Sequence, residues 1–455
     1  MKTYQDLLQI SENEADRMTF VKSVISQHKS SDLYHTANVA DQYFRHKNVT
    51  ITNYQKILYK VTGEAVPDNW SANFKMACRH FFRFVTQENQ FLLGNGASWE
   101  KKDTAEKLGN DRYSFDNQLQ DLGVKALIGG VSFGFFNFDH IDVFSVLEFA
   151  PLFDEVDGSI KAGVRFWQID STKPLRATLY ELDGYTDYIW TNTTVGKDWQ
   201  KVVDNQYCKA KQPYKLNIAS SEAEGDQIIA GENYPDFPIV PLWGNKEHQS
   251  ELVGLREQID CYDLIKSGFA NDVDEASLIY WTLSNAGGMD DIDLAQFVEK
   301  LKTLHAVKVD DDVQAESHSI DVPYASREAL LDRIDKDLYR DAMALDTEAI
   351  AGGAITATQI RAAYEPLNSK CDSFEYCVLD FIQKILFLAG IDDEPTFTRS
   401  MIVNVNESVQ TISQAAAYLP DDYVTKKILT LLGDGDKANE IIAQMQADDL
   451  PTIDE

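Results

Sequence analysis

The residues most suggestive of chemistry are a glycine pair between two helical stretches. Gly352 and Gly353 lie among small residues and come shortly before a helical pattern. A glycine-rich loop at a helix N-terminus can bind phosphate, because free backbone N–H groups point at the anion. Here the GxxxxGK[ST] pattern is absent, no lysine lies beside the glycines, and the segment before them has a helical rather than a strand pattern. We therefore predict no nucleotide site at this loop.

Other reactive residue types also lack a catalytic arrangement. The eight histidines show neither HExxH nor HxH spacing, and there is no GxSxG motif or convincing cysteine–histidine pair. Asp139-His140 beside Asp142 offers a metal corner, but a surface turn at a strand end is the simpler interpretation. The aspartates at 310–312 lack the alternation and glycine of a calcium loop. We expect no catalytic residue, no metal and no cofactor.

Cysteine usage and hydropathy favour a protein of a reducing compartment. Five scattered cysteines, none in a CxxC pair, are predicted to be buried free thiols: Cys78, Cys208, Cys261, Cys371 and Cys377. The N-terminal residues show no apolar signal-peptide region, so we do not expect secretion. The most apolar helical stretch, residues 374–391, contains three charged residues and is predicted to pack inside the protein rather than cross a membrane.

The net charge of −31 over 455 residues is unevenly distributed. Residues 247–350 hold nine basic and 24 acidic side chains, a net of −15, whereas residues 1–246 hold 26 and 32, a net of −6. Tight nucleic-acid binding needs lysine and arginine to neutralise phosphates, so this acidity argues against it. An acidic surface that maintains solubility is the simplest explanation.

Periodicity predicts a predominantly helical α+β fold. Residues 1–125 are expected to be mostly helical, with one helix over 73–96 and a second that turns into a strand at Val131. A two-residue period with turns at Asp157-Gly158 and Asp183-Gly184 predicts antiparallel hairpins up to about Trp190. The prolines that follow predict a rigid connector and a boundary near residue 245: Pro235, Pro238 and Pro241.

The second half is expected to alternate long helices with a small insert. Helices are predicted over 247–272 and 326–345, the latter N-capped by Ser326. Between them we expect strands at 277–283 and 305–309 around a helix at 293–304. A third helix over 358–389 should be kinked by Pro366, because proline removes a backbone donor. A strand at 396–405 and helices at 407–419 and 422–446 close the chain.

This order of elements resembles the portal proteins of tailed double-stranded-DNA bacteriophages. The similarity covers nearly the whole chain and depends on the combination and order of several stretches. These are "YHTANVADQYFRHKNVTI", "EFAPLFDEVDGSIKAGVRFWQ", "ATLYELDGYTDYIW", "IVPLWGNKEHQSELVGLREQIDCYDLIKSGFANDV" and the glycine loop with its flanking helices.

The resemblance implies a division of the chain into wing, stem, clip and crown. It assigns 1–246 to the wing, 247–272 and 326–345 to two stem helices, and 273–325 to the clip. Residues 346–357 match the tunnel loop, and 358–405 match the kinked helix and a strand that returns to the wing. Residues 406–455 match the crown helices and an acidic tail.

The family's function implies the partners and the location. We expect a ring of twelve copies at one capsid vertex of the virion, assembled in the host cytoplasm, through which double-stranded DNA passes without sequence-specific binding during packaging and ejection. The terminase large subunit, head-completion or adaptor proteins, and capsid and scaffolding proteins are the implied partners, with no membrane. The alternatives from the residues alone are an acidic helical adaptor of the cytoplasm or an enzyme of unrecognised type.

The assignment to a tunnel loop explains why a glycine pair without neighbouring cations interrupts an acidic helical region. Glycine and alanine give small bulk and backbone freedom, and the lack of cations avoids tight phosphate contacts. An ordinary surface connection is the alternative. The residues that the resemblance implies to face DNA are Thr347, Glu348, Ala351, Gly352, Gly353, Ala354, Ile355 and Thr356.

Overall fold

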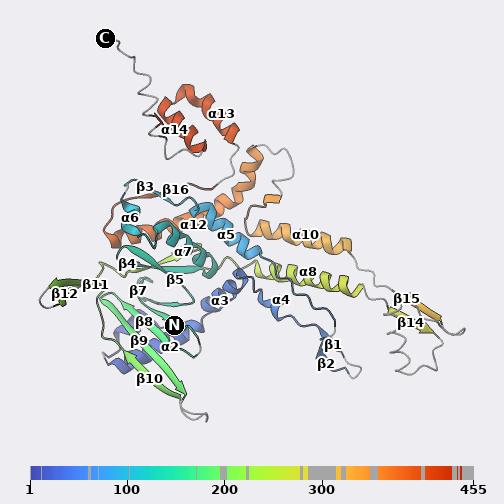
Figure 1. Cartoon of the computed structure of the whole chain (residues 1–455), viewed down its shortest axis with the longest axis horizontal. Coiled ribbons are helices and arrows are strands. Elements are labelled where there is room, and N and C mark those ends of the chain that lie inside the picture. The colour runs from blue at the N-terminus through green and yellow to red at the C-terminus, as the bar shows by residue number, and fades with distance from the viewer. Residues whose placement is uncertain are drawn as a thin grey trace.

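The computed structural model describes most of the chain. The described residues are 2–11, 13–59, 63–69, 71–101, 103–170, 172–194, 202–221, 225–276, 280–284, 314–318, 324–348, 357–400, 405–432, 438 and 441–442. Figure 1 shows a central body from which two helices, α8 (Arg256–Ala276) and α10 (Tyr324–Asp341), extend side by side. The helices α13 (Val405–Ala415) and α14 (Asp421–Leu432) lie on another side of the body.

The N-terminal part is helical, as predicted, but includes short strands. Its helices are α1 (Tyr4–Leu8), α2 (Glu14–Lys29), α3 (Asp32–Phe44), α4 (Val49–Asn53), α5 (His80–Leu93), α6 (Thr104–Leu108) and α7 (Phe115–Gly129). The short strands β1 (Ile57–Tyr59) and β2 (Ala65–Pro67) form a hairpin, and β3 (Ala97–Trp99) pairs with a late strand. The helix predicted over 73–96 begins only at His80, because backbone N–H groups of residues 74–78 bond side chains of α8 instead.

Antiparallel sheets occupy the middle of the chain, as the two-residue period predicts. One sheet has the order β13-β4-β5 and the other the order β10-β9-β8-β7-β6. Their strands are β4 (Val131–Asn137), β5 (His140–Ser145), β6 (Phe149–Phe153), β7 (Ile160–Trp167), β8 (Leu175–Glu181), β9 (Gly184–Thr194), β10 (Val202–Cys208) and β13 (Ile239–Trp243). A separate hairpin joins β11 (Lys215–Ser221) to β12 (Gly225–Glu232).

The proline-rich connector prediction is wrong in part, because β13 runs through it. Pro241 pairs with Phe133 of β4, and β13 is the edge strand of its sheet. An edge strand tolerates a missing N–H on its open side, which reconciles proline with a strand here.

The second half contains the long helices, with boundaries that differ from the predictions. They are α8 (Arg256–Ala276), α10 (Tyr324–Asp341), α12 (Ala357–Ala389), α13 (Val405–Ala415) and α14 (Asp421–Leu432), with a short 3-10 turn η1 (Ala416–Tyr418). Helix α8 begins nine residues later than the prediction, after turns that include Gly254 at a φ of 86°. Helix α10 begins two residues early, so Ser326 lies inside its first turn instead of capping it.

The small insert is described only at its two ends. Strand β14 (Tyr280–Ser284) pairs antiparallel with β15 (Gln314–His318), a strand that was not predicted. The helix predicted at 293–304, the strand at 305–309 and the aspartate turn at 310–312 lie outside the described residues. The strand predicted at 396–405 is shorter in the described part, where β16 (Pro395–Phe397) pairs with β3.

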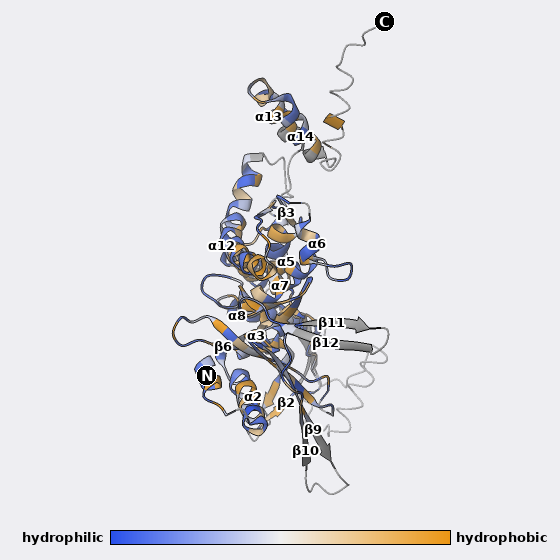
Figure 2. Ribbon diagram, turned by 90° about the vertical axis from the view of Figure 1, so that its left-hand side faces the viewer, coloured by the Kyte–Doolittle hydropathy of each residue, from blue (hydrophilic) through white to orange (hydrophobic). Residues whose placement is uncertain are grey.

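One large apolar core joins the first and second halves of the chain. It contains buried residues of α3, α5, α7, β4, β13, α8 and α12. Figure 2 shows hydrophobic residues concentrated where α12, α5 and α7 meet, with hydrophilic residues on outer edges. The apolar stretch after Phe374 lies in this core, and no described helix is long and apolar enough to cross a membrane. All five cysteines are free thiols, but only Cys78 and Cys371 are buried, and Cys261 is exposed.

Candidate functional site

The segment from α10 to α12 leaves the end of α10 through a well-defined helix cap. Met343 has a φ of 53°, in the left-handed region that is unusual for a residue with a side chain. Its N–H bonds the carbonyl of Arg340 at 3.1 Å, and the N–H of Ala344 bonds that of Tyr339 at 3.0 Å. This pair of bonds is a Schellman motif, which satisfies carbonyls that the helix end leaves open. The chain direction after α10 is therefore set by hydrogen bonds.

We call the residues that anchor the two ends of this loop its feet. The first foot, Leu345, is held on α5. The backbone N–H of Leu345 donates to Gln87 Oε1 at 2.9 Å, and Gln87 Nε2 donates to the carbonyl of Leu345 at 3.0 Å. The Leu345 side chain is buried in a small apolar cluster with Phe91 of α5 and with Tyr364 and Leu367 of α12. Leu345 is thus fixed through both backbone and side chain.

The second foot is held on the same helix. The ring of Tyr364, in the second turn of α12, stacks on Phe91 with centroids 5.6 Å apart. Both ends of the loop therefore rest on α5, so this helix sets the distance between them.

Lys370 joins four elements around these feet. Its ammonium lies 2.8 Å from Glu88 Oε2 of α5 and 2.7 Å from Glu251 Oε2, in the turns before α8. It also donates to the carbonyl of Ala342 at the end of α10, at 3.2 Å. Because Lys370 itself belongs to α12, one side chain connects α5, α10, α12 and the approach to α8. We call this group, Lys370 with Glu88 and Glu251, the lysine hub.

Burial determines the electrostatics of the lysine hub. Desolvation raises the pKa of Glu88 to about 7, although Lys370 opposes this shift. Burial alone would lower the pKa of Lys370, but the charges of Glu88 and Glu251 outweigh it and raise that pKa above its ordinary value. One ammonium is shared by two carboxylates. Lys370 therefore remains charged near neutral pH, while the more deeply buried carboxylate, Glu88, is partly protonated.

The residues predicted to face DNA are only partly described. Thr347 and Glu348 are exposed, and the Glu348 N–H donates to Asp346 Oδ1 at 2.9 Å. Glu348 and Asp346 line a cleft of about 820 Å³ that also contains Arg79 and Arg83. The remaining residues lie outside the described part of the chain: Ala351, Gly352, Gly353, Ala354, Ile355 and Thr356. Their role stays a prediction.

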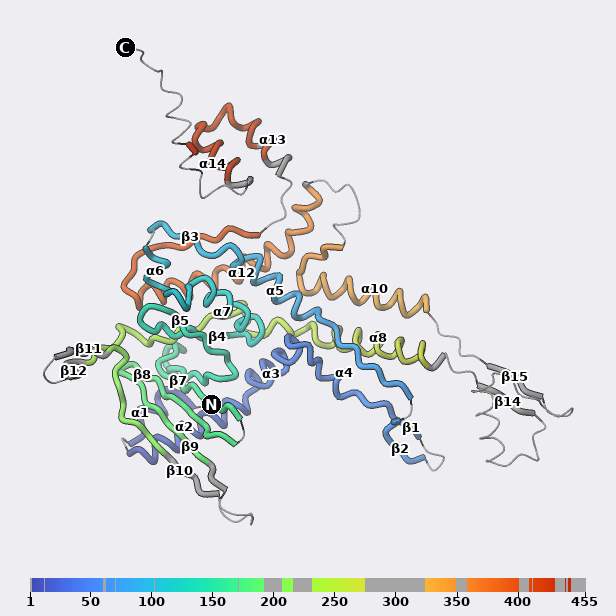
Figure 3. The backbone as a smooth tube through the Cα atoms, in the orientation of Figure 1, coloured from blue at the N-terminus to red at the C-terminus, as the bar shows by residue number. Residues whose placement is uncertain are grey.

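Pro366 lies inside α12, as predicted. Figure 3 shows that α12 changes direction between its first turns and its longer second part. Pro366 has no backbone N–H, so it cannot donate to the carbonyl of Ala362 in the preceding turn. Both residues are exposed. Water can therefore satisfy that carbonyl, which makes the interruption tolerable.

The α8 helix is held by a second device, a ladder of side-chain acceptors along one face. Asp263, Ser267 and Asn271 are four residues apart and are all buried. They accept backbone N–H groups of Cys78, Met76 and Phe74 at 2.8, 2.9 and 2.7 Å, respectively. Four helical residues rise about 6 Å and two extended residues about 6.6 Å, so the spacings match. We call residues 74–78 the strap and the three acceptors the polar ladder.

The first rung also gathers other donors. Asp263 Oδ2 accepts from Asn48 Nδ2 at 2.5 Å, and burial raises the pKa of Asp263. Asp260, one helical turn earlier, accepts from Thr50 of α4 at 2.7 Å and from the hydroxyl of Tyr43 of α3. The start of α8 is thus bonded to α3, α4 and the strap together.

A Cys78–His80–Asp335 chain was missed by the sequence analysis because Asp335 is distant in sequence. His80 Nδ1 lies 2.9 Å from Cys78 Sγ, and His80 Nε2 lies 2.7 Å from Asp335 Oδ1. This order resembles a nucleophilic triad, but a reactive cysteine must ionise easily. Here burial, with the charge of Asp263, raises the pKa of Cys78 to about 12, and burial lowers that of His80. The arrangement favours a neutral thiol and imidazole that link the strap to α10.

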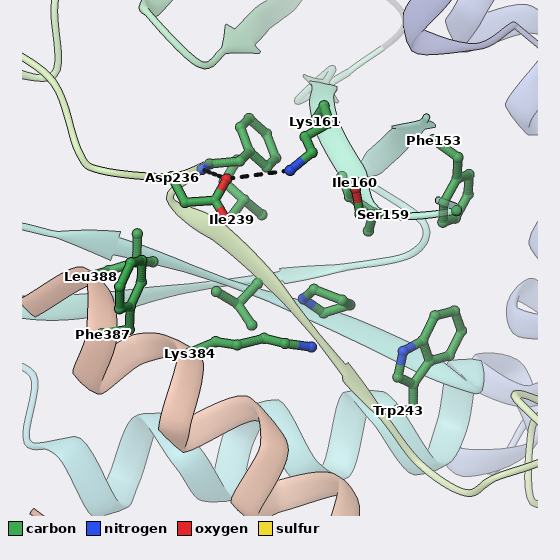
Figure 4. Close-up of a pocket in the computed structure, with 14 residues that line it drawn as sticks. Phe153, Ser159, Ile160, Lys161, Asp236, Ile239, Trp243, Lys384, Phe387 and Leu388 are labelled. Carbon is green, nitrogen blue, oxygen red and sulfur yellow. Dashed lines mark hydrogen bonds and ion pairs between the residues drawn. The ribbon is translucent and has the colours of Figure 1, made fainter. Parts of the chain in front are cut away.

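A smaller pocket lies between the β6–β7 turn, β13 and α12. It has a volume of about 250 Å³, and Figure 4 shows aromatic and aliphatic side chains around it, with Lys161 directed at Asp236. The Lys161–Asp236 ion pair measures 3.6 Å. Its lining includes no histidine or cysteine.

Asp139 lies in a turn before β5, in agreement with the surface turn preferred from the sequence. His140 Nδ1 is 2.8 Å from Asp139 Oδ1, and the His140 ring stacks on Tyr113 with centroids 4.9 Å apart. Within the described residues no cluster of three potential ligands could hold a metal ion.

Comparisons with known proteins identify relatives over most of the chain. A family model described as "Phage portal protein, SPP1 Gp6-like" matches residues 24–449. The portal protein of Bacillus phage SPP1 is 24% identical, with 87% of this chain and 80% of that protein covered. The portal protein of Clostridium phage phiCD119 is also 24% identical, with 48% of this chain covered, and the chain spans about half (51%) of that relative's length.

Solved structures show more distant similarity. The neck of an empty GTA particle computed with C6 symmetry has a TM-score of 0.46 and 11% identity, covering 79% of this chain and 91% of the other. A native gene transfer agent virion gives a TM-score of 0.44 and 11% identity, covering 77% and 89%. These scores are too low to establish a shared fold.

Proposed function

Because the chain belongs to the SPP1 Gp6-like family of phage portal proteins, we propose that it forms a closed ring around a DNA channel at one capsid vertex. Twelve copies make the ring in the virion. Double-stranded DNA passes through it during genome packaging and again during ejection, without sequence-specific binding.

The observation that carries this proposal is the loop with two fixed feet and no cations. Its feet are attached to α5 at Leu345 and Tyr364. Residues 346–357 contain no lysine or arginine. A loop that approaches a moving duplex must be narrow and must not hold it. About 6–10 phosphate contacts change affinity roughly 10³–10⁵-fold over ordinary salt ranges, so cations in every copy would retard sliding.

The acidity of the chain supports passage over capture. Residues 247–350 carry a net charge of −15, and they include α8 and α10. A negative wall repels a polyanion and keeps it from adhering. We assign α8 and α10 to the stem, residues 273–325 to the clip and residues 406–455 to the crown helices and acidic tail. Residues 1–246 and the β16 region form the wing.

The partners follow from this assignment. The clip receives the terminase large subunit, which supplies the energy for packaging, and later the head-completion or adaptor proteins. Capsid and scaffolding proteins surround the wing. The chain itself is a structural component of the virion, without catalysis, and is assembled in the host cytoplasm.

Electron microscopy of the purified protein tests the ring. Closed rings with a central hole are expected, and a protein that stays monomeric under all conditions contradicts the proposal. The loop is tested by Gly353→Lys, with Gly353→Ser as the uncharged control. We expect the lysine variant to form rings but package less DNA than the serine variant. Equal packaging by the two would contradict the requirement for a loop without cations.

A further inference from the structure

Residues 45–79, which we call the arm, differ from the rest of the chain in charge. They connect α3 to α5 and contain α4, the β1–β2 hairpin and the strap. The arm carries six basic and two acidic residues, a net of +4, whereas the whole chain has a net charge of −31. The arm and the rest of a second copy therefore carry net charges of opposite sign, which favours their association.

The arm also exposes many large apolar side chains. Tyr59 is 72% exposed and Ile57 59%, and every residue of β1 is exposed. The others are Tyr54, Leu58, Phe74 and Met76. The hairpin pairs only three residues on each side, and a two-stranded hairpin alone is marginally stable in water. A cluster of exposed apolar residues on such a hairpin indicates a surface that another molecule covers.

The outer half of α10 is the complementary surface. All residues of its first two turns are exposed except Arg327, which is half-buried and paired with Asp272. Two large apolar side chains, Tyr324 and Leu330, are 51% and 46% exposed. Exposed Glu328 and Asp332 give this part of the helix a negative charge, which suits a basic and apolar partner.

Cys78 at the inner end of the strap approaches α10 through His80, but most of the arm lies on the opposite side of α8 from α10. The strap bonds Asp263, Ser267 and Asn271, whereas α10 contacts Gln258, Phe269 and Asp272. At about 100° per residue, these two sets fall on opposite faces of the helix. Figure 1 shows the same arrangement, with α10 on one side of α8 and the β1–β2 hairpin on the other.

We propose that the arm of one copy docks on the outer half of α10 of the next copy. Two different surfaces on opposite sides of one element make a heterologous contact, which closes into a ring when the rotation between copies allows it. This inference rests on the proposed ring and names the surfaces that build it.

Two surface variants test the contact. The arm variant carries Ile57→Asp and Tyr59→Asp, and the α10 variant carries Leu330→Asp. All three side chains are exposed, so each variant is expected to fold with an unchanged thermal midpoint. Val156→Asp, at an 89% exposed position in the turn before β7, is the control. Native mass spectrometry of the full-length proteins should show at least a tenfold loss of rings for each variant and none for the control.

Mixing the two variants distinguishes this interface from a general loss of assembly. The α10 variant keeps an intact arm and the arm variant keeps an intact α10, so one contact remains between them. The mixture should give heterodimers but no rings. Rings from either variant alone overturn the inference while the proposed ring stands, as does a mixture without heterodimers. Wild-type protein that never forms rings overturns the proposed function instead.

Discussion

The lysine hub and the polar ladder both hold an element against the body, but they distribute the interaction differently. At the hub, one ammonium bonds two carboxylates and a carbonyl from three other elements. Along the ladder, three side chains of α8 each receive a separate backbone N–H of the strap. A single substitution can therefore remove all the contacts of the hub, whereas the ladder should weaken one rung at a time.

The largest expected effect is at the hub. Lys370→Met removes the cation that pairs with Glu88, which is 2% exposed, and leaves Glu88 and Glu251 close together. Removing one partner of a buried ion pair costs about 3–5 kcal/mol, because the other charge stays buried without compensation. Chemical denaturation at pH 7 measures the free energy of unfolding.

Lys384→Met is the matched control, since Lys384 pairs with Asp380 on the exposed face of the same helix. Such a surface pair contributes about 0–1 kcal/mol. Similar losses of unfolding free energy for the two variants would contradict this prediction, because the hub would then contribute no more than an exposed ion pair.

The next effect is at the first rung of the ladder. Asp263→Ala leaves the N–H of Cys78 and the amide of Asn48 without this acceptor, and it should cost about 2–3 kcal/mol. Ser267→Ala, which removes one bond, should cost about 1 kcal/mol. Glu257→Ala, at an exposed position of α8, is the control.

Hydrogen exchange tests whether the three hydrogen bonds of the polar ladder open independently or as one cooperative unit. Ser267→Ala should speed exchange at Met76 and leave the amide of Leu345 protected. Equal loss of protection across the strap and the loop foot would mean that the two devices act as one.

A smaller effect is the pH dependence of the hub. The pKa of Glu88 is raised from 4.5 to about 7, so the folded protein keeps a proton that the unfolded chain has lost. The contribution of Glu88 to stability therefore falls as pH rises from about 4.5 to about 7, by at most about 1.4 kcal/mol per pH unit. Glu88→Gln cannot titrate and should flatten this part of the profile, measured by denaturation at several pH values. Asp380→Asn should keep the wild-type slope, and an unchanged slope in Glu88→Gln would assign the dependence to another group.

Local patterns predicted the parts of this molecule that local forces determine. The helix after the glycine loop, with Pro366 inside it, and the two hairpin turns agree with the structure. The turn glycines Gly158 and Gly184 have φ angles of 71° and 139°, which the Asp-Gly signals anticipate.

Long-range partners explain what the sequence did not reveal. Residues 74–78 have a helical pattern, but their N–H groups bond α8, almost 200 residues away, and that contact overrides local propensity. Lys370 is one lysine among many until the fold brings it to Glu88 and Glu251. The polar residues of the ladder were visible at four-residue spacing, but nothing in the sequence named the strap as their partner.

The smallest expected effect on stability, and the sharpest on function, is at Pro366. Pro366→Ala restores a backbone donor at an exposed position, while Tyr364 on one side and Phe374 on the other remain held by buried contacts. Those contacts should keep the free energy of unfolding within about 1 kcal/mol of the wild type. If the bend transmits movement between the loop and the wing, DNA packaging should fall although stability does not, and Glu365→Ala, at the neighbouring exposed position, should package normally. Unchanged packaging and ring geometry in Pro366→Ala would show that the bend only lets α12 wrap around the core and transmits no movement.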